Sequence, residues 1–225
     1  MAIITNLTNE TRDPFVGLTP LEIKRLNYPL WGHQLVGVYL MFVGIFGFTE
    51  NLLVIFTFAK NKQLLSATNI FILGVAIGDF CMAALGNPLA FTSALNGKWW
   101  AGEFFCYWEG FIVYTFGLSQ LYLLVAVSID RYVVIAKPLL APKITKKVAK
   151  LSVGACFAFS AIWSIPPFFG WGNYGLEAPG TFCGLHWDDR SAAMASYVVS
   201  ITLFCFVIPM GVMVFCYYHV FMTVN

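Results

Sequence analysis

The sequence predicts an all-α membrane protein, and three observations lead to this fold class. Of the 225 residues, 59% are hydrophobic and only 11% are charged, and the mean hydropathy is +0.76. So few charges cannot cover the surface of a soluble globule of this length. Long apolar runs recur along the chain, and in lipid their backbone polar groups must bond within their own segment, which favours helices. The alternating pattern over about ten residues that is typical of membrane β-strands does not occur in the sequence.

Five apolar runs reach or exceed the roughly 20 residues that a membrane-spanning helix needs. Their approximate bounds are residues 34–58, 69–91, 104–134, 148–169 and 197–221. We therefore divide the chain into an N-terminal segment, residues 1–33, and a helical region, residues 34–225, that contains transmembrane helices one to five. The polar start of the chain lacks the features of a cleavable signal peptide, so we expect the first helix to serve as its own insertion signal.

The lysine and arginine residues orient these helices, because loops rich in them face the cytoplasm. The loops after the first and third runs are basic and carry Lys60, Lys62, Lys137, Lys143, Lys146, Lys147 and Lys150. The alternate loops have no basic excess and carry Lys98, Glu103, Glu177, Asp188, Asp189 and Arg190. This pattern places the N-terminus outside the cell membrane, and two N-glycosylation sequons, at Asn6 and Asn9, agree with that side.

With the N-terminus outside, five helices bring the chain to Asn225 on the inner side, directly after an apolar run. We therefore expect a truncation after helix five. The formal net charge of only +2 argues against nucleic acid as a partner, because membrane topology explains the basic residues that are present.

Two of the six cysteines, Cys106 and Cys183, fall at the predicted outer face. That side is oxidising, so we expect them to form a disulfide between the third helix and the loop before the fifth, rather than to remain free thiols. The other four lie within apolar runs, where cysteine usually acts as a small hydrophobic residue: Cys81, Cys156, Cys205 and Cys216.

The third run carries charged residues near both ends. Cys106 and Asp130 are separated by about 36 Å along a helix, which crosses a bilayer. Glu109 lies about one turn below the outer face, where a carboxylate must be protonated, reach water or pair with a cation. No lysine lies at membrane depth, so a buried lysine partner must come from outside this sequence. Glu109 is either such a counter-charge or a rim residue that reaches the surface.

The triplet Asp130-Arg131-Tyr132 ends the same run at the inner side. An ion pair between the adjacent acid and arginine would break on protonation of Asp130, which would make the triplet a switch. The alternative is an interfacial anchor. Ionisable groups also occur within the first two runs, where Glu50 beside Asn51 and Asp79 form either a buried polar network or a water or sodium cluster that senses conformation.

Taken together, the motifs resemble the rhodopsin class of G-protein-coupled receptors, whose members have a seven-transmembrane helix bundle. The positions that match this class in order and spacing are Asn51, Asp79, Cys106, Asp130-Arg131-Tyr132, Cys183, Pro209 and Tyr217. The resemblance covers the chain from about residue 36 onward. It implies that helices six and seven follow Asn225.

Narrower features resemble the opsins within that class. Glu109 stands where vertebrate visual opsins carry the counterion to a protonated retinal Schiff base, and Glu177 stands where many other opsins carry an alternative counterion. The run Pro166-Pro167-Phe168-Phe169-Gly170-Trp171 is similar to the opsin connection between the fourth helix and an outer β-hairpin. The resemblance implies retinal as the chromophore, with its attachment lysine on the seventh helix.

Positions carried over from the opsin pocket would line the chromophore, although ordinary helix packing is the alternative for each. They are Gly86, Gly110, Val113, Tyr114, Gly117, Leu118, Tyr174, Leu185, Trp187 and Phe206. Two residues depart from the class. Phe157 replaces the usual tryptophan of the fourth helix, which indicates a divergent member. Glu50 replaces a common glycine, which predicts an extra buried acid near Asp79.

The leading hypothesis is a light-sensing receptor that uses retinal to activate a heterotrimeric G protein. A second is a retinal photoisomerase, since the segment from Thr181 to Trp187 resembles the peropsin branch. A third is a receptor for a lipid or peptide ligand. An amine receptor is disfavoured because Val113 replaces the aspartate of that subgroup. We predict no enzyme activity and no metal site, because the three histidines lack metal-ligand spacing: His33, His186 and His219.

Overall fold

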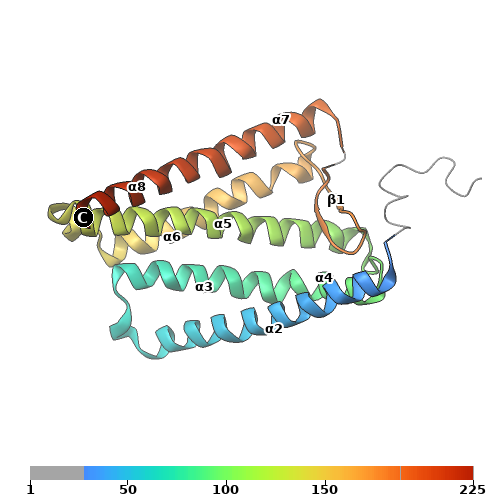
Figure 1. Cartoon of the computed structure of the whole chain (residues 1–225), viewed down its shortest axis with the longest axis horizontal. Coiled ribbons are helices and arrows are strands. Elements are labelled where there is room, and N and C mark those ends of the chain that lie inside the picture. The colour runs from blue at the N-terminus through green and yellow to red at the C-terminus, as the bar shows by residue number, and fades with distance from the viewer. Residues whose placement is uncertain (1–27, 188, 225) are drawn as a thin grey trace, which may run out of the picture.

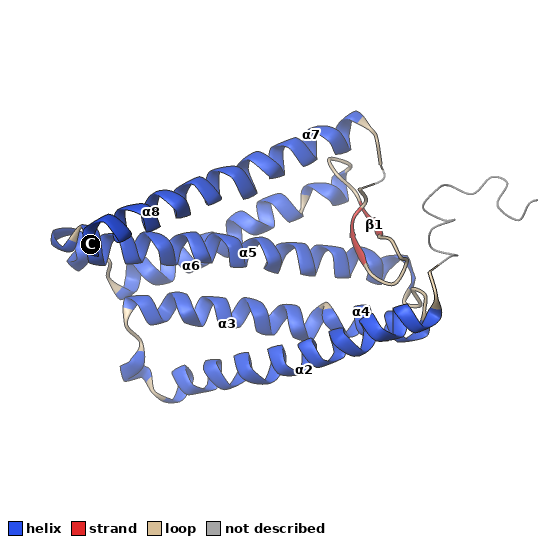
Figure 2. Ribbon diagram, in the orientation of Figure 1, coloured by secondary structure: helices blue, strands red, loops and turns tan. Residues whose placement is uncertain are grey.

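The computed structural model, which describes residues 28–187 and 189–224, is a bundle of long helices with one short β-hairpin (Figure 1, Figure 2). Five helical segments in this part of the chain are long and apolar enough to cross a membrane. Each contains one of the predicted runs, so the predicted spans are confirmed. The segments are Leu30–Lys60, Ala67–Asn96, Gly102–Ala136, Lys146–Phe169 and Ala192–Val224.

The elements follow one another along the chain as helices, with short 3-10 segments after α2, α5 and α6 and with the hairpin before the last span. The long helices are α2 (Leu30–Lys60), α3 (Ala67–Leu85), α4 (Asn87–Asn96), α5 (Gly102–Ala136), α6 (Lys146–Ser164), α7 (Ala192–Ile201) and α8 (Ile208–Val224). The predicted boundary at residues 33 and 34 lies inside α2. The two sequons, Asn6 and Asn9, lie outside the described residues.

Hydroxyl side chains cap three helices and explain where they begin. The Ser66 Oγ accepts a hydrogen bond from the backbone N–H of Asn69 at the start of α3, at 3.1 Å. Thr145 and Ser191 cap α6 and α7 in the same way. An N-cap satisfies a backbone donor that has no partner within its helix. These three helices therefore begin a few residues before the apolar runs that predicted them.

Two prolines interrupt the regular spans. Gly86 and Pro88 separate α3 from α4, and Asn87 at the break donates its Nδ2 hydrogen bond to the Leu40 carbonyl of α2, at 2.9 Å. In the last span, Pro209 follows a stretch of π-helix, Thr202–Val207, between α7 and α8. Proline has no N–H to donate to the preceding turn, so the helix departs from regular geometry near it.

The hairpin lies across the end of the bundle where α2 and α5 begin, and the described chain ends at the opposite end (Figure 1). Strand β1 (Tyr174–Leu176) pairs antiparallel with β2 (Cys183–Leu185), with Leu176 opposite Cys183. The predicted disulfide is confirmed: Cys106 of α5 is bonded to Cys183 of β2, with a Cα–Cα distance of 5.2 Å. On the chain-entropy model, closing a loop of this length stabilises the fold by about 4 kcal/mol.

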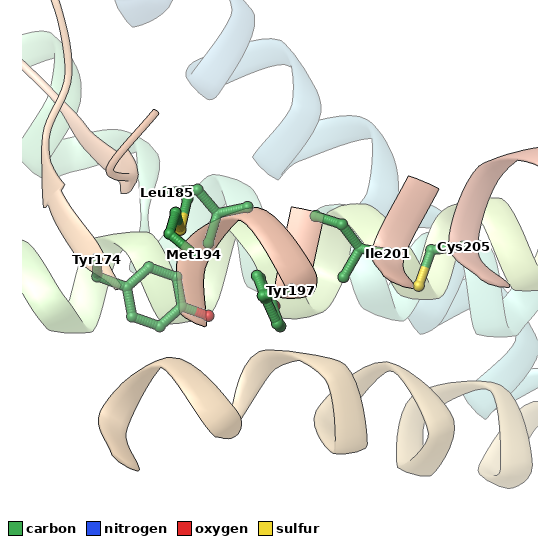
Figure 3. Close-up of a cluster of buried hydrophobic side chains, with 6 residues drawn as sticks. All are labelled: Tyr174, Leu185, Met194, Tyr197, Ile201 and Cys205. Carbon is green, nitrogen blue, oxygen red and sulfur yellow. The ribbon is translucent and has the colours of Figure 1, made fainter. Parts of the chain in front are cut away.

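A buried cluster joins the hairpin to the last span (Figure 3). Its members come from β1, β2, α7 and the π-helical stretch: Tyr174, Leu185, Met194, Tyr197, Ile201 and Cys205. The Tyr174 hydroxyl also donates a hydrogen bond to the Ser164 carbonyl of α6, at 2.8 Å. The hairpin is therefore packed against several helices and holds a defined position at this end of the bundle.

Candidate functional site

Glu109 of α5 lies beneath the hairpin and is only 1% exposed. Its Oε2 accepts a hydrogen bond from the backbone N–H of Cys183, at 2.8 Å, so the carboxylate and the disulfide hold the same residue of β2. Its Oε1 is buried and has no hydrogen-bond partner among the described residues. The interpretation of Glu109 as a rim residue that reaches the surface is wrong, because the hairpin covers it.

Glu177 is the residue directly after β1, at the start of the turn that leads to β2. Its backbone N–H donates a hydrogen bond to the Phe182 carbonyl, at 3.0 Å, which continues the hairpin pairing. Burial raises the pKa of the Glu177 carboxyl above its usual range, although a hydrogen bond from the Trp187 side chain works in the opposite direction. The hairpin holds the two carboxyl groups close enough for the negative charges of Glu109 and Glu177 to repel each other.

A cavity of about 520 Å³ extends from Glu109 along α2 and α3. Asn51 and Asp79, which come from the first two spans, line it at greater depth together with apolar side chains. The Asn51 amide donates a hydrogen bond to the Gly47 carbonyl of its own helix, at 2.8 Å. The structure therefore brings three predicted polar residues, Asn51, Asp79 and Glu109, to one cavity.

Glu50 does not join this group. Its side chain is exposed on α2, whereas Asn51 is partly buried and faces the cavity. Successive residues on an α-helix are rotated by about 100° around its axis, so the two side chains point in different directions. The expectation of an extra buried acid near Asp79 is wrong for this reason.

The ten residues expected to line a chromophore pocket divide into one residue at the end of α3, Gly86, and two larger groups. Gly86 lies against Val113 of α5. The first group lies around or beside the hairpin and its buried cluster: Gly110, Tyr114, Leu118, Tyr174 and Leu185. In this group a Cβ on Gly110 would lie 2.7 Å from the Tyr174 ring, so the missing side chain lets the hairpin approach α5.

The second group is exposed: Val113, Gly117, Trp187 and Phe206. Trp187 is 59% exposed and Phe206 is 53% exposed, and only Val113 of the ten lines the cavity beside Glu109. The helices of the described chain therefore do not enclose these ten side chains together, and their role in a pocket stays a prediction.

At the opposite end of α5, Asp130 is 2% exposed and forms the predicted ion pair with Arg131, with an Nη2–Oδ2 distance of 2.6 Å. Thr68 of α3 completes the arrangement. Its hydroxyl donates a hydrogen bond to Asp130 Oδ2, at 2.9 Å, and accepts one from Arg131 Nη2, at 2.5 Å. Thr68 belongs to no motif in the sequence and lies 62 residues from Asp130, so only helix packing brings the two side chains together.

The remaining positions that match the receptor class lie around this end or along the last span. The Tyr132 ring contacts the Phe215 and His219 rings of α8, with centroid distances of 5.7 and 5.8 Å. Pro209 is buried, whereas Tyr217 is exposed. Their part in a conformational switch stays a prediction.

Comparison with known proteins identifies relatives of nearly the whole described chain. Residues 50–225 match the family described as "7 transmembrane receptor (rhodopsin family)". The chain is 38% identical over 187 residues to "Rhodopsin, GQ-coupled" of Mizuhopecten yessoensis. The aligned residues are 82% of this chain and 38% of that protein. It is 32% identical over 206 residues to melanopsin of Homo sapiens. Here the aligned residues are 91% of this chain and 43% of that protein.

Among solved structures, the crystal structure of squid rhodopsin superimposes with a TM-score of 0.85 at 29% sequence identity. The match covers 92% of this chain and 60% of that chain. The chain thus spans about two fifths of the length of the curated relatives given above.

Proposed function

The chain belongs to the rhodopsin family of seven-transmembrane receptors, and from this membership we propose that it senses light with a retinal chromophore and activates a heterotrimeric G protein. Its relatives include a rhodopsin and melanopsins, which supports an opsin within the family. The chain is a multi-pass membrane protein, since five of its helices are long and apolar enough to span a bilayer. Because it covers only part of its relatives, the activity is proposed for the full-length protein.

The pair of acids at the hairpin, Glu109 buried and Glu177 half-buried, is the observation that supports retinal most directly. Glu109 has one carboxylate oxygen without a hydrogen-bond partner among the described residues, and it lines a cavity of about 520 Å³. A cavity of this size lies in the range of small-molecule sites, which extends from about 300 to 1,000 Å³. A protonated imine is a cation that a nearby carboxylate stabilises. The residues present therefore fit the chromophore, and either Glu109 or Glu177 would balance its charge.

Retinal would supply the absorption of light, and its attachment lysine is proposed to lie in sequence outside this chain. The chain's own residues would hold and orient the chromophore. Glu109 is fixed by the Cys183 backbone N–H, so its charge has a defined position relative to the hairpin. We propose that the exposed members of the expected pocket, Val113, Trp187 and Phe206, contact the chromophore or the helices that enclose it.

The orientation in the membrane follows from the basic loops. Lys60 ends α2 and Lys62 follows it, and Lys143, Lys146 and Lys147 lie around the start of α6, all at the end opposite the hairpin (Figure 1). We propose that this end faces the cytoplasm and that the hairpin and the N-terminus lie outside. On that side the sequons Asn6 and Asn9 could be glycosylated.

The cytoplasmic end would engage the G protein. There the Asp130, Arg131 and Thr68 side chains join α5 to α3, and release of Arg131 would loosen this contact. The similarity to a rhodopsin named as Gq-coupled supports a G protein of the Gq class.

The test is to express the full-length protein, supply retinal and measure both absorption and light-dependent activation of purified Gq. We expect a visible absorption band and G-protein activation that depends on light. Isomerisation of retinal by light without any activation would instead support the photoisomerase hypothesis. Absence of a retinal-dependent band would contradict the proposal.

A further inference from the structure

Strand β2 has one buried face and one bare face. Side chains alternate between the two faces of a strand, so Cys183 and Leu185 share one face and Gly184 the other. Cys183 and Leu185 are buried, with Cys183 bonded to α5 and Leu185 packed in the hairpin cluster. At Gly184 the opposite face of the strand carries no side chain.

The Glu177 carboxyl group occupies the space that a side chain at Gly184 would fill. A Cβ atom built on Gly184 would collide with Glu177 Oε1 and would lie 2.9 Å from Glu177 Cδ. The carboxyl group therefore lies directly against the backbone of β2. This contact is possible only where the strand has no side chain.

Backbone conformation does not explain the glycine. The described glycines with a positive φ, the conformation that favours glycine, are Gly97, Gly102, Gly170, Gly172 and Gly180. Gly184 is not one of them, and it pairs with Gly175 in a regular antiparallel register. An alanine could therefore adopt the backbone of residue 184, so the space above the residue is what requires glycine.

We propose that Gly184 is a positioning residue, whose bare face seats the Glu177 carboxyl group on β2 and so fixes the second negative charge beside Glu109. Three groups surround this seat. Glu109 of α5 repels the charge, Trp187 donates a hydrogen bond to it, and His186 packs against the paired glycine, Gly175. This inference rests on the proposed function only where Glu177 acts on a chromophore, and the seat itself does not depend on retinal.

The substitution Gly184→Ala tests the seat without breaking the fold. The atoms that it would strike are at the end of a flexible side chain, so Glu177 can rotate away while the backbone stays in place. Gly175→Ala is the matched control, because its Cβ would meet His186, at 3.1 Å, rather than an acid. The yield of folded protein should be similar for the two variants.

The first measurement needs no retinal. Burial raises the pKa of Glu177, so displacement of the carboxyl group into water should lower that pKa toward its usual value, measured by infrared or NMR titration of that side chain in the full-length receptor. Gly175→Ala should leave the value unchanged. An unchanged Glu177 pKa in Gly184→Ala, in protein that folds normally, would overturn the proposal.

The second measurement uses the pigment. Gly184→Ala should shift the pKa of the retinal Schiff base in the same direction as Glu177→Gln, and it should add no further shift in a Glu177→Gln background. A full additional shift in the double variant would overturn the positioning role. Failure of the wild-type protein to bind retinal would contradict the proposed function but would leave the first measurement as a complete test of the seat.

Discussion

The two ends of α5 each bury one carboxylate, and they balance its charge differently. Asp130 is 2% exposed and is paired with the Arg131 guanidinium and the Thr68 hydroxyl. Glu109 is 1% exposed and has a single hydrogen-bond partner within the described part of the chain, the backbone N–H of Cys183. A buried charge is costly unless it is compensated. The Asp130 end is therefore a closed structural contact, whereas the Glu109 end is suited to receive a cation or a proton.

The largest expected effect comes from removing the covalent bond that holds the hairpin over Glu109. Cys183→Ser breaks the disulfide to Cys106, and loss of such a bond typically costs about 2 to 5 kcal/mol. We expect loss of folded protein or of retinal uptake, measured as pigment yield in the full-length receptor. Cys81→Ser is the control, because Cys81 is a free cysteine within α3. A normal yield from Cys183→Ser would mean that the hydrogen bond to Glu109 and the buried cluster suffice to hold the hairpin.

Glu109→Gln removes the charge but keeps an oxygen that can accept the Cys183 hydrogen bond. The fold should survive, and the pKa of the Schiff base should fall by about 1 to 3 units, since a nearby negative charge favours the protonated imine. Spectroscopic titration measures this value, with Glu177→Gln as the parallel variant. An unchanged Schiff base pKa in Glu109→Gln would transfer the counterion role to Glu177.

Asp130→Asn tests the compensated end. It removes the ion pair with Arg131. Because the Arg131 side chain is 37% exposed, solvent screening limits the lost stabilisation of this contact to about 1 to 2 kcal/mol. We expect G-protein activation in the dark to rise by about 5-fold to 30-fold, because that free energy no longer holds Arg131. The control is Asp189→Asn, which removes an acid near the hairpin. Unchanged dark activity would favour the interpretation of the triplet as an interfacial anchor.

Thr68→Val should change G-protein activation in the dark in the same direction as Asp130→Asn, but by the smallest amount of these variants. It removes a hydroxyl that bonds both Asp130 and Arg131, and a hydrogen bond of this kind contributes about 1 kcal/mol. Dark activation should rise by about fivefold. Thr57→Val is a matched control, because the Thr57 hydroxyl bonds the Leu53 carbonyl of its own helix, at 2.8 Å. Equal effects of the two substitutions would show that Thr68 acts through general stability.

Several features could be predicted from the sequence because they depend on neighbouring residues or on the chemistry of one side of the membrane. The five spans follow from apolar length, and the Asp130–Arg131 pair joins adjacent residues. The Cys106–Cys183 disulfide could be predicted because the loop charges predict that those two cysteines lie on the oxidising side. The family follows from several such positions in a fixed order.

The residues at the expected pocket positions differ in burial, which the sequence did not predict. Tyr174 and Leu185 are buried in the hairpin cluster, whereas Trp187 and Phe206 are exposed. The type of residue at a position does not reveal which helices pack over it. The packing of the helices decides which of these residues are buried.

The sequence by itself determined the membrane class of this protein, the number of its spans in the described chain and its family, since hydrophobic length and charge are properties of local segments. Only the tertiary structure decided that Thr68 meets Asp130, that Glu50 points away from Asp79, and that the Glu177 carboxyl group lies against Gly184. These contacts join residues from different elements or depend on the rotation of a helix and the face of a strand. Their geometry arises when the helices and the hairpin pack together, and no local pattern encodes it.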